Sequence, residues 1–211
     1  MNFHILNLII MNKYPIATLL GASGKIGRLL VRIMTKKNYR CIIPSRNPFS
    51  KGFLKTQAPP GAIEFIKFNQ NNFNEIENAI NNSDVVVNLC GILYETRKQK
   101  FFKIHSDLPE SIAKICSRSN VKKFIHTSAL GASAESKSKY QRSKFLGEEK
   151  SLESFDKTVI IRPSVVVSSD DEFTNLFGKL STLPVIPVLN KNYNFQPIFA
   201  NDVAKAIMKA I

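Results

Sequence analysis

The chain has 211 residues, which suits one α/β domain with a sizeable core. Hydrophobic residue types make up 44% of it, as in ordinary globular proteins, and no apolar run reaches the roughly 20 residues that span a bilayer. The net charge of +14 favours anionic partners such as nucleotides, acidic protein surfaces or lipid head groups. No nucleic-acid-binding motif accompanies this charge, so nucleic acid is not an expected partner.

The first residues, 1–11, are apolar but lack the basic start and the small-residue cleavage site of a signal peptide. Met11 stands a few residues before the first expected strand. We therefore expect 1–11 to be an apolar leader that comes from an upstream start codon, and 12–211 to form one domain. A short membrane-touching segment is the alternative. The expected location is the cytoplasm, with peripheral attachment to the inner face of the membrane as the second option.

Apolar runs alternate with amphipathic segments along the chain, and this order predicts a doubly wound parallel sheet with helices on both faces, a Rossmann-like α/β fold. The expected strands cover 16–20, 41–44, 63–68, 85–89, 124–127 and 158–162, with a short one at 185–189. The expected helices cover 25–37, 73–81, 101–119, 137–154, 172–180 and 201–211. The segment 48–60 is expected to be a loop with at most one helical turn.

The first strand runs into a glycine-spaced turn that opens directly into a helix. In this order Gly21 permits the tight turn, Gly24 leaves room for a pyrophosphate against the backbone, and Gly27 lets the helix lie close to the strand. Free N–H groups at the start of a helix bind phosphate. The spacing G-x-x-G-x-x-G differs from the G-x-G-x-x-G of typical dehydrogenases, but its context predicts a bound dinucleotide.

The second strand is followed by Arg46. A domain specific for NAD usually has an acidic residue here, which binds the adenosine ribose hydroxyls. The planar fork of an arginine instead suits a 2′-phosphate. We therefore expect NADP(H) as the preferred cofactor and NAD(H) as the alternative. Arg46 as an ordinary surface cation of a basic protein is the competing interpretation.

Ser128 stands at the end of an expected strand, and Tyr140 and Lys144 stand four residues apart on the next expected helix. Residues at this spacing share one helix face. The lysine charge is expected to lower the phenol pKa and to hold the nicotinamide ribose. The phenol can then pass a proton to or from a carbonyl that the serine hydroxyl positions. Ser128, Tyr140 and Lys144 are thus the candidate catalytic residues.

The three cysteines, Cys41, Cys90 and Cys116, have no paired pattern and no metal-ligand spacing. Buried free thiols in a reducing compartment are expected, and no metal site is expected. His126 beside Ser128 is more typical of a structural histidine.

The glycine turn, the strand-end serine and the tyrosine–lysine pair together resemble the short-chain dehydrogenase/reductase superfamily, in its extended or atypical branch, over nearly the whole chain. The resemblance implies where the cofactor lies. Asn69 and Gln70 stand where the family often has an aspartate and an apolar residue against adenine, which weakens that contact. The implied cofactor-binding residues are Gly21, Ser23, Gly24, Lys25, Ile26, Gly27, Arg46, Asn69, Gln70, Leu89, Cys90, Gly91, Tyr140, Lys144 and Pro163.

A closer resemblance is carried by residues 88–95, 126–132, 138–144 with 147–149, 161–164 and 195–204. These segments look like one branch of the superfamily, the nucleotide-binding accessory subunit of respiratory complex I and its bacterial relatives. This resemblance implies a tightly held NADPH, a structural or assembly role, and respiratory subunits as partners. Two departures bear on catalysis. The stretch 166–171 lacks the V-x-G-P of related enzymes, and we expect the C-terminal region that supplies much of the substrate pocket in this family to be missing or truncated.

Three functions are therefore open. The first is a structural protein that holds a cofactor within a complex I-like assembly. The second is an NADP-dependent reductase, epimerase or dehydratase that uses Ser128, Tyr140 and Lys144 on a small carbonyl or sugar substrate. The third is a decayed, truncated pseudoenzyme that folds poorly.

Overall fold

A computed structural model describes residues 14–69, 71–169, 175, 178, 180–182 and 195–211. The leader expected at 1–11, Gln70, the strand expected at 185–189 and most of the helix expected at 172–180 lie outside the described residues.

The six strands expected before residue 163 form one parallel sheet, as the alternating pattern predicted. They are β1 (Ile16–Leu20), β2 (Arg40–Ser45), β3 (Ile63–Lys67), β4 (Val85–Asn88), β5 (Lys123–Thr127) and β6 (Thr158–Ile161). Their order is β3-β2-β1-β4-β5-β6, and every neighbouring pair is parallel. The order reverses between β1 and β4, and ligands of doubly wound sheets bind at such a reversal, at the carboxyl ends of the strands.

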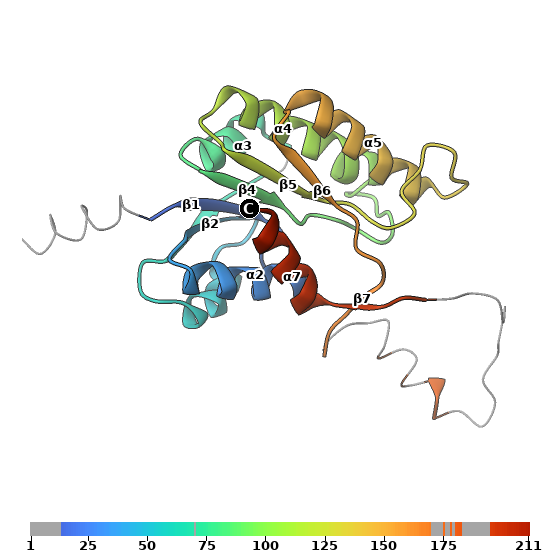
Figure 1. Ribbon diagram of the computed structural model, residues 1–211, viewed down its shortest axis with the longest axis horizontal. Coiled ribbons are helices and arrows are strands. Elements are labelled where there is room, and N and C mark those ends of the chain that lie inside the picture. Colours follow the sequence, from blue (N-terminus) through green and yellow to red (C-terminus); the bar gives the residue numbers. More distant parts are fainter. Residues whose placement is uncertain (1–13, 70, 170–174, 176–177, 179, 183–194) are drawn as a thin grey trace, which may run out of the picture.

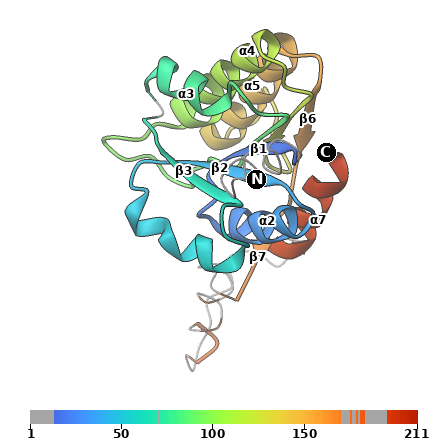
Figure 2. The same ribbon diagram turned by 90° about the vertical axis from the view of Figure 1, so that its left-hand side faces the viewer.

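Helices cover both faces of this sheet (Figures 1 and 2). On one face lie α2 (Lys25–Lys36) and α7 (Ala200–Ala210), and on the other lie α3 (Phe73–Ile80), α4 (Leu108–Arg118) and α5 (Lys139–Ser154). Each face has its own apolar core, because successive strand side chains point to opposite sides. On β1, Leu19 packs into the α2–α7 core and Leu20 into the core beneath α3 and α4.

The segment between β2 and β3 corrects the sequence prediction. Instead of a loop with at most one helical turn, Phe49–Gln57 forms a 3-10 helix of nine residues. Leu54 is the buried residue of this segment and packs into the α2–α7 core. A single buried side chain gives no helical periodicity in the sequence, so the pattern alone could not indicate the helix.

The helix expected at 101–119 forms, but its beginning is not purely α-helical. A π-helical turn, Lys103–Asp107, precedes α4 and contains His105 and Ser106. Such turns insert a residue into an α-helix and are frequent at functional sites. A short parallel pair that the sequence did not indicate, β7 (Val166–Val167) and β8 (Ile198–Phe199), connects the chain after β6 with the start of α7. Among the described residues, no helix has the length and apolar character that crossing a membrane requires.

Candidate functional site

A cavity of about 530 Å³ opens at the strand reversal, over the carboxyl ends of β1, β2 and β4. Its walls come from the glycine turn, from the residues after β2, and from the segment 89–92 after β4. We call this cavity the cofactor cleft. Seven residues that the sequence pointed to line it: Gly21, Ser23, Gly24, Arg46, Leu89, Cys90 and Gly91.

The glycine turn fits tightly against its surroundings. Gly21 has a φ of +80°, and a Cβ there would lie 2.9 Å from the carbonyl carbon of Leu89. A Cβ on Gly27 would lie 2.5 Å from Cα of Ala22. Both glycines are therefore required by the backbone packing itself, and Gly27 acts by bringing α2 close to the turn rather than by lining the cleft.

The amino end of α2 fits an anionic group. Gly24 is its N-cap and offers no side-chain hydrogen bond, so the first backbone N–H groups of the helix have no side-chain cap. The Gly24 N–H itself is bonded to the carbonyl of Gly21 at 3.0 Å. The groups available to a pyrophosphate are thus the N–H groups that follow Gly24.

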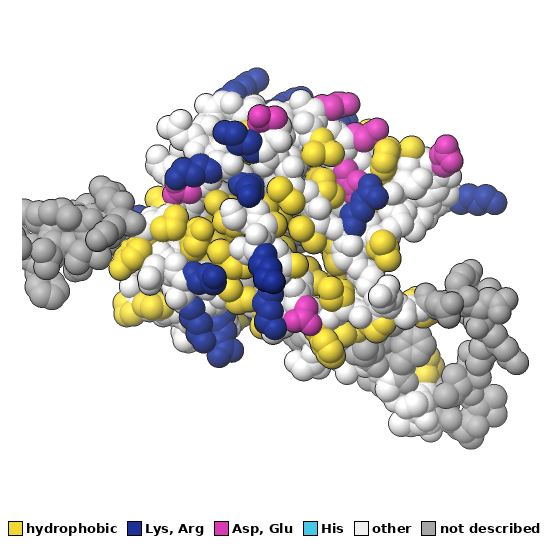
Figure 3. Space-filling view, viewed as in Figure 1, with side chains coloured by type: hydrophobic (Ala, Val, Ile, Leu, Met, Phe, Trp, Pro, Cys, Tyr) yellow, Lys and Arg dark blue, Asp and Glu magenta, His cyan; other side chains and the backbone are white. Residues whose placement is uncertain are grey.

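Two residues of the turn have side chains that lie away from the cleft. Ile26 packs against the α2–α7 core. Lys25 lines a different cavity of about 690 Å³, together with Arg28, Arg32 and Lys36 of the same helix. Figure 3 shows Lys and Arg side chains gathered over α2 and α7 on this face of the molecule. For Lys25 and Ile26, only the backbone is placed where a dinucleotide phosphate would lie.

The cleft is cationic at the end beneath β2. Arg46 and Lys51 line it, and none of the described residues that line it is acidic. Asn69 does not line it. Its backbone N–H donates to a carboxylate oxygen of Glu75 at 2.7 Å, and its side-chain oxygen accepts from the N–H of Asn71 at 3.1 Å. Phe68, buried at the end of β3, lines the cleft instead. Sequence reasoning had not selected this apolar contact.

The three candidate catalytic residues come from β5 and α5. The Ser128 N–H donates to the carbonyl of Ile161 at 2.8 Å, which fixes the backbone after β5, while its buried hydroxyl and that of Thr127 have no hydrogen-bond partner among the described residues. The Lys144 ammonium donates to the Thr127 carbonyl at 3.1 Å. The carbonyl of Pro163 accepts from the N–H of Leu130 at 2.8 Å, in the segment that follows Ser128. Pro163 does not line the cleft.

Burial controls the ionisation of this group. It lowers the pKa of Lys144 to about 8, because the charged form loses its hydration. It raises the pKa of Tyr140 for the same reason, so the expected lowering of the phenol pKa by the lysine is not found. Burial also raises the pKa of Cys90 to about 11, which keeps it a neutral thiol at the cleft wall.

Close packing of α5 against the π-helical turn positions Tyr140 and Lys144. A Cβ on Gly147 would lie 1.7 Å from the carbonyl oxygen of His105. At the neighbouring position, the buried Glu148 carboxylate accepts a hydrogen bond from Nε of Arg162 at 2.9 Å, which ties α5 to the end of β6. The helix that carries the tyrosine–lysine pair therefore has little freedom to shift.

Sequence reasoning missed His105. Its ring packs edge-on against Tyr140, with centroids 5.2 Å apart, and stacks with Phe101 at 5.4 Å. Its two ring nitrogens contact Ser143 and the backbone of Ile92, at 2.9 and 3.0 Å. The available signal in the sequence was a histidine within an amphipathic helix, but this signal does not show which groups the ring contacts.

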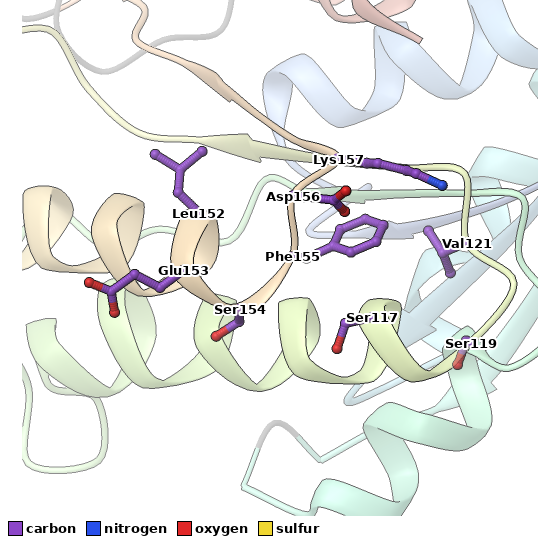
Figure 4. Close-up of a pocket in the computed structure, with 9 residues that line it drawn as sticks. All are labelled: Ser117, Ser119, Val121, Leu152, Glu153, Ser154, Phe155, Asp156 and Lys157. Atoms are coloured by element: carbon purple, nitrogen blue, oxygen red, sulfur yellow. The ribbon is translucent and has the colours of Figure 1, made fainter.

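A smaller cavity, of about 360 Å³, lies at the opposite ends of the strands from the cofactor cleft, where α4 and α5 end and β6 begins. Figure 4 shows the Phe155 ring turned towards Val121, and both side chains belong to the core beneath α3 and α4. Ligands of doubly wound sheets bind at the carboxyl ends of the strands. This hollow is at the amino ends, and we assign no ligand to it.

The fold and the cleft agree with comparisons to known proteins. The pattern of the NAD(P)H-binding family matches residues 21–164. This chain belongs to that family. The UDP-glucuronic acid 4-epimerase of Bacillus cereus, solved in complex with UDP-glucuronic acid and NAD, has a similar fold. It superimposes with a TM-score of 0.73 at 18% identity, over 92% of this chain and 72% of the enzyme.

The chain is also similar to a mitochondrial subunit named NADH dehydrogenase [ubiquinone] 1 alpha subcomplex subunit 9. It is 34% identical to that of Dictyostelium discoideum, over 93% of this chain and 55% of the relative. The mouse subunit is 32% identical, over 92% of this chain and 52% of the relative. The chain thus spans about half the length of the curated relatives it matches.

The buried histidines predict acid-sensitive stability. Burial and the nearby Lys144 charge lower the pKa of His105 to about 3, and the pKa of His126 is lowered as well. Unfolded histidines titrate near pH 6.5, so below that pH the unfolded chain binds protons that the folded chain does not. The free energy of unfolding should fall by about 1.4 kcal/mol per pH unit for each histidine, beginning near pH 6.5.

Urea unfolding at pH 7, 6 and 5 measures this effect. The window lies above the range in which carboxylates with a lowered pKa, such as Glu95 and Glu110, begin to contribute. In the variant His105→Gln, the free energy of unfolding should fall less steeply with decreasing pH, because the contribution of one histidine is lost. An unfolding free energy that is unchanged from pH 7 to pH 5 would mean that the two histidines take up protons in the folded protein as readily as in the unfolded chain.

Proposed function

We propose that this chain holds NADP(H), in preference to NAD(H), in the cofactor cleft and serves as a structural or assembly component of a complex I-like respiratory assembly. One observation carries the cofactor preference. The cleft wall beside β2 has Arg46 and Lys51 and, within the described part of the chain, no acidic residue, which favours a 2′-phosphate over free ribose hydroxyls. The similarity to complex I subunits supports the assembly role.

The proposed placement follows the cleft. The pyrophosphate lies at the uncapped start of α2, against Gly21, Ser23 and Gly24, with backbone N–H groups of Lys25, Ile26 and Gly27 facing it. The adenosine phosphate meets Arg46. The nicotinamide end passes Leu89, Cys90 and Gly91 towards Ser128, Tyr140, Lys144 and Pro163. Phe68, which lines the cleft, has a larger part at the adenine than Asn69, which does not.

Native mass spectrometry of the protein purified from membranes of its own source tests both parts of this proposal. A mass increase of one nucleotide, released on denaturation and identified as NADP(H), supports the cofactor assignment. Co-purification of respiratory subunits supports the assembly role. Recovery of a nucleotide-free protein would contradict the first part, and recovery of the protein alone would contradict the second.

A second function, an NADP-dependent reductase, epimerase or dehydratase, has one observation in its favour. The buried hydroxyl of Ser128 is unpaired among the described residues, and Lys144 has its pKa near neutrality. An orphaned polar group beside a perturbed lysine is typical of sites that bind a reacting group. NADP(H) would supply the hydride chemistry, while Tyr140 would move the proton and Ser128 would orient the carbonyl oxygen.

If that chemistry operates, Tyr140→Phe should abolish it. The substitution removes the one hydroxyl that exchanges a proton with the substrate and keeps the ring that packs against His105. Loss of general acid–base catalysis typically costs about 100- to 10,000-fold in rate. The measurement is NADPH consumption with a panel of small carbonyl and nucleotide-sugar substrates. Equal turnover by Tyr140→Phe and the parent protein would exclude the mechanism in which Tyr140 moves the proton, and no turnover by the parent protein with any substrate of the panel would contradict the enzymatic role.

A further inference from the structure

The protonation of His105 follows from its two hydrogen bonds. The N–H of Ile92 can only donate, so Nε2 of His105, 3.0 Å away, accepts. A neutral imidazole then carries its proton on Nδ1, which donates to Oγ of Ser143 at 2.9 Å. The Ser143 hydroxyl in turn donates to the carbonyl of Tyr140 at 2.7 Å. One directed chain of hydrogen bonds thus runs from the cleft wall to the start of α5.

His126 has the opposite arrangement. The Oδ1 of Asn88 accepts from the N–H of Cys90 at 3.1 Å, which identifies the other end of this amide as the NH2 group. That NH2 group faces Nδ1 of His126 at 3.2 Å, so Nδ1 accepts and the proton is on Nε2. His126 therefore holds the cleft wall through Asn88, as His105 holds it directly.

Both histidines are fully buried. Burial lowers the pKa of each ring, and the charge of the nearby Lys144 lowers it further. The rings therefore remain neutral around pH 7. The tautomer of His105 follows from hydrogen bonds at both ring nitrogens, and that of His126 from the bond at Nδ1, because its Nε2 has no partner among the described residues.

The backbone that these histidines hold, residues 89–92, forms one wall of the cofactor cleft. A Cβ on Gly21 would lie 2.9 Å from the carbonyl carbon of Leu89 and 3.0 Å from the nitrogen of Cys90, so the glycine turn packs directly on this wall. A Cβ on Gly91 would lie 3.4 Å from Nζ of Lys144. The position of the wall thus sets both the room beside the glycine turn and the separation from Lys144.

We propose that His105 and His126 are positioning residues that, as opposite neutral tautomers, fix the wall at Cys90–Ile92 and so hold the cleft in the shape that receives the dinucleotide. This inference rests on the proposed binding of NADP(H). It assigns a shared role to two side chains that are 21 positions apart in sequence and that come from the π-helical turn and from β5.

The tautomers can be observed without any cofactor. Long-range ¹H–¹⁵N spectra of the ¹⁵N-labelled protein at pH 7 distinguish a protonated Nδ1 from a protonated Nε2. We expect His105 to carry its proton on Nδ1 and His126 to carry it on Nε2. Assignment uses the ring neighbours of each histidine in the parent protein, which are Phe101 and Tyr140 for His105 and Phe124 for His126. A protonated Nε2 on His105, or an imidazolium on either residue, would overturn the inference even if every variant failed to fold.

Two substitutions separate the hydrogen bonds of His105. Glutamine can place its side-chain oxygen near the former Nε2 and so keep an acceptor for the Ile92 N–H. The shorter asparagine can place its NH2 group near the former Nδ1 but leaves the Ile92 N–H without an acceptor. A buried N–H without a partner is costly, so His105→Asn should weaken NADPH binding by about tenfold or more. His105→Gln should stay within roughly threefold of the parent.

NADPH fluorescence titration measures these affinities, and the melting temperature of the cofactor-free variants measures the loss of packing common to them. Equal weakening by the asparagine and glutamine variants would overturn the positioning role and leave the proposed function intact. A parent protein that does not bind NADPH would instead overturn the proposed function, and with it any role of these residues in cofactor binding.

Discussion

Replacing Gly147 with alanine is expected to lower the free energy of unfolding by about 3 kcal/mol or more, at the upper end of overpacking substitutions. The added Cβ would lie 1.7 Å from the carbonyl oxygen of His105. Neither group can turn aside, because one belongs to the backbone of the π-helical turn and the other to α5. The two helices must separate, which also exposes the buried contacts that position Tyr140 and Lys144.

Thermal or urea unfolding measures this effect, and for a chain of this size the melting temperature should fall by about 6–12 °C. Gly52→Ala is the matched control. Gly52 lies in the 3-10 helix, its φ is not in the left-handed region, and nothing lies within 4 Å of the added Cβ. That substitution should change stability by no more than about 0.5 kcal/mol. Equal effects of the two substitutions would mean that α5 can move away from His105 at little cost.

The sheet could be predicted from the sequence because its strands are short apolar runs at regular spacing. Strand β4 is Val85–Asn88, buried along its whole length. The cleft followed from the same pattern, since residues directly after β1, β2 and β4 meet at one edge in a parallel sheet. Arg46 lines the cleft for this reason alone.

Side-chain direction could not be predicted in the same way. Lys25 belongs to the glycine turn in sequence, yet its side chain lines a separate cavity along α2. Asn69 follows β3 but pairs with its own neighbours. In both cases the pattern places the backbone correctly, and local hydrogen bonds and helix geometry decide where the side chain lies.

The histidine pair and the π-helical turn depend on contacts between distant segments. His105 is in the turn before α4 and bonds the backbone of Ile92, whereas His126 is in β5 and reaches Asn88 because β4 and β5 are neighbours in the sheet. The pKa of the Tyr140 phenol could not be predicted for the same reason. The four-residue spacing puts Tyr140 and Lys144 on one helix face, but the burial of Tyr140, which raises its pKa, is a property of the packed structure.

Arg46→Glu is expected to reverse the preference of the protein between the two nicotinamide cofactors. The arginine lines the cleft where the proposed 2′-phosphate lies, and a carboxylate there would repel that phosphate but accept hydrogen bonds from a ribose. Loss of one charge-assisted hydrogen-bonding group costs about 1.5–3 kcal/mol, which corresponds to roughly 10- to 150-fold weaker NADPH binding. NADH binding should stay within about threefold of the parent or improve.

Arg32→Glu controls for the change in net charge, because it reverses one positive charge on the outer side of α2, where Arg32 lines the other cavity. Its effect on NADPH must act at a distance through solvent and salt, and at physiological ionic strength it should be small. Fluorescence titration of the parent and both variants with NADPH and NADH measures the affinities. Dividing each variant's affinity for each cofactor by that of the parent gives four ratios. If Arg46→Glu and Arg32→Glu weaken NADPH and NADH alike, Arg46 does not contact the 2′-phosphate, and the cofactor preference has no basis in the cationic wall of the cleft.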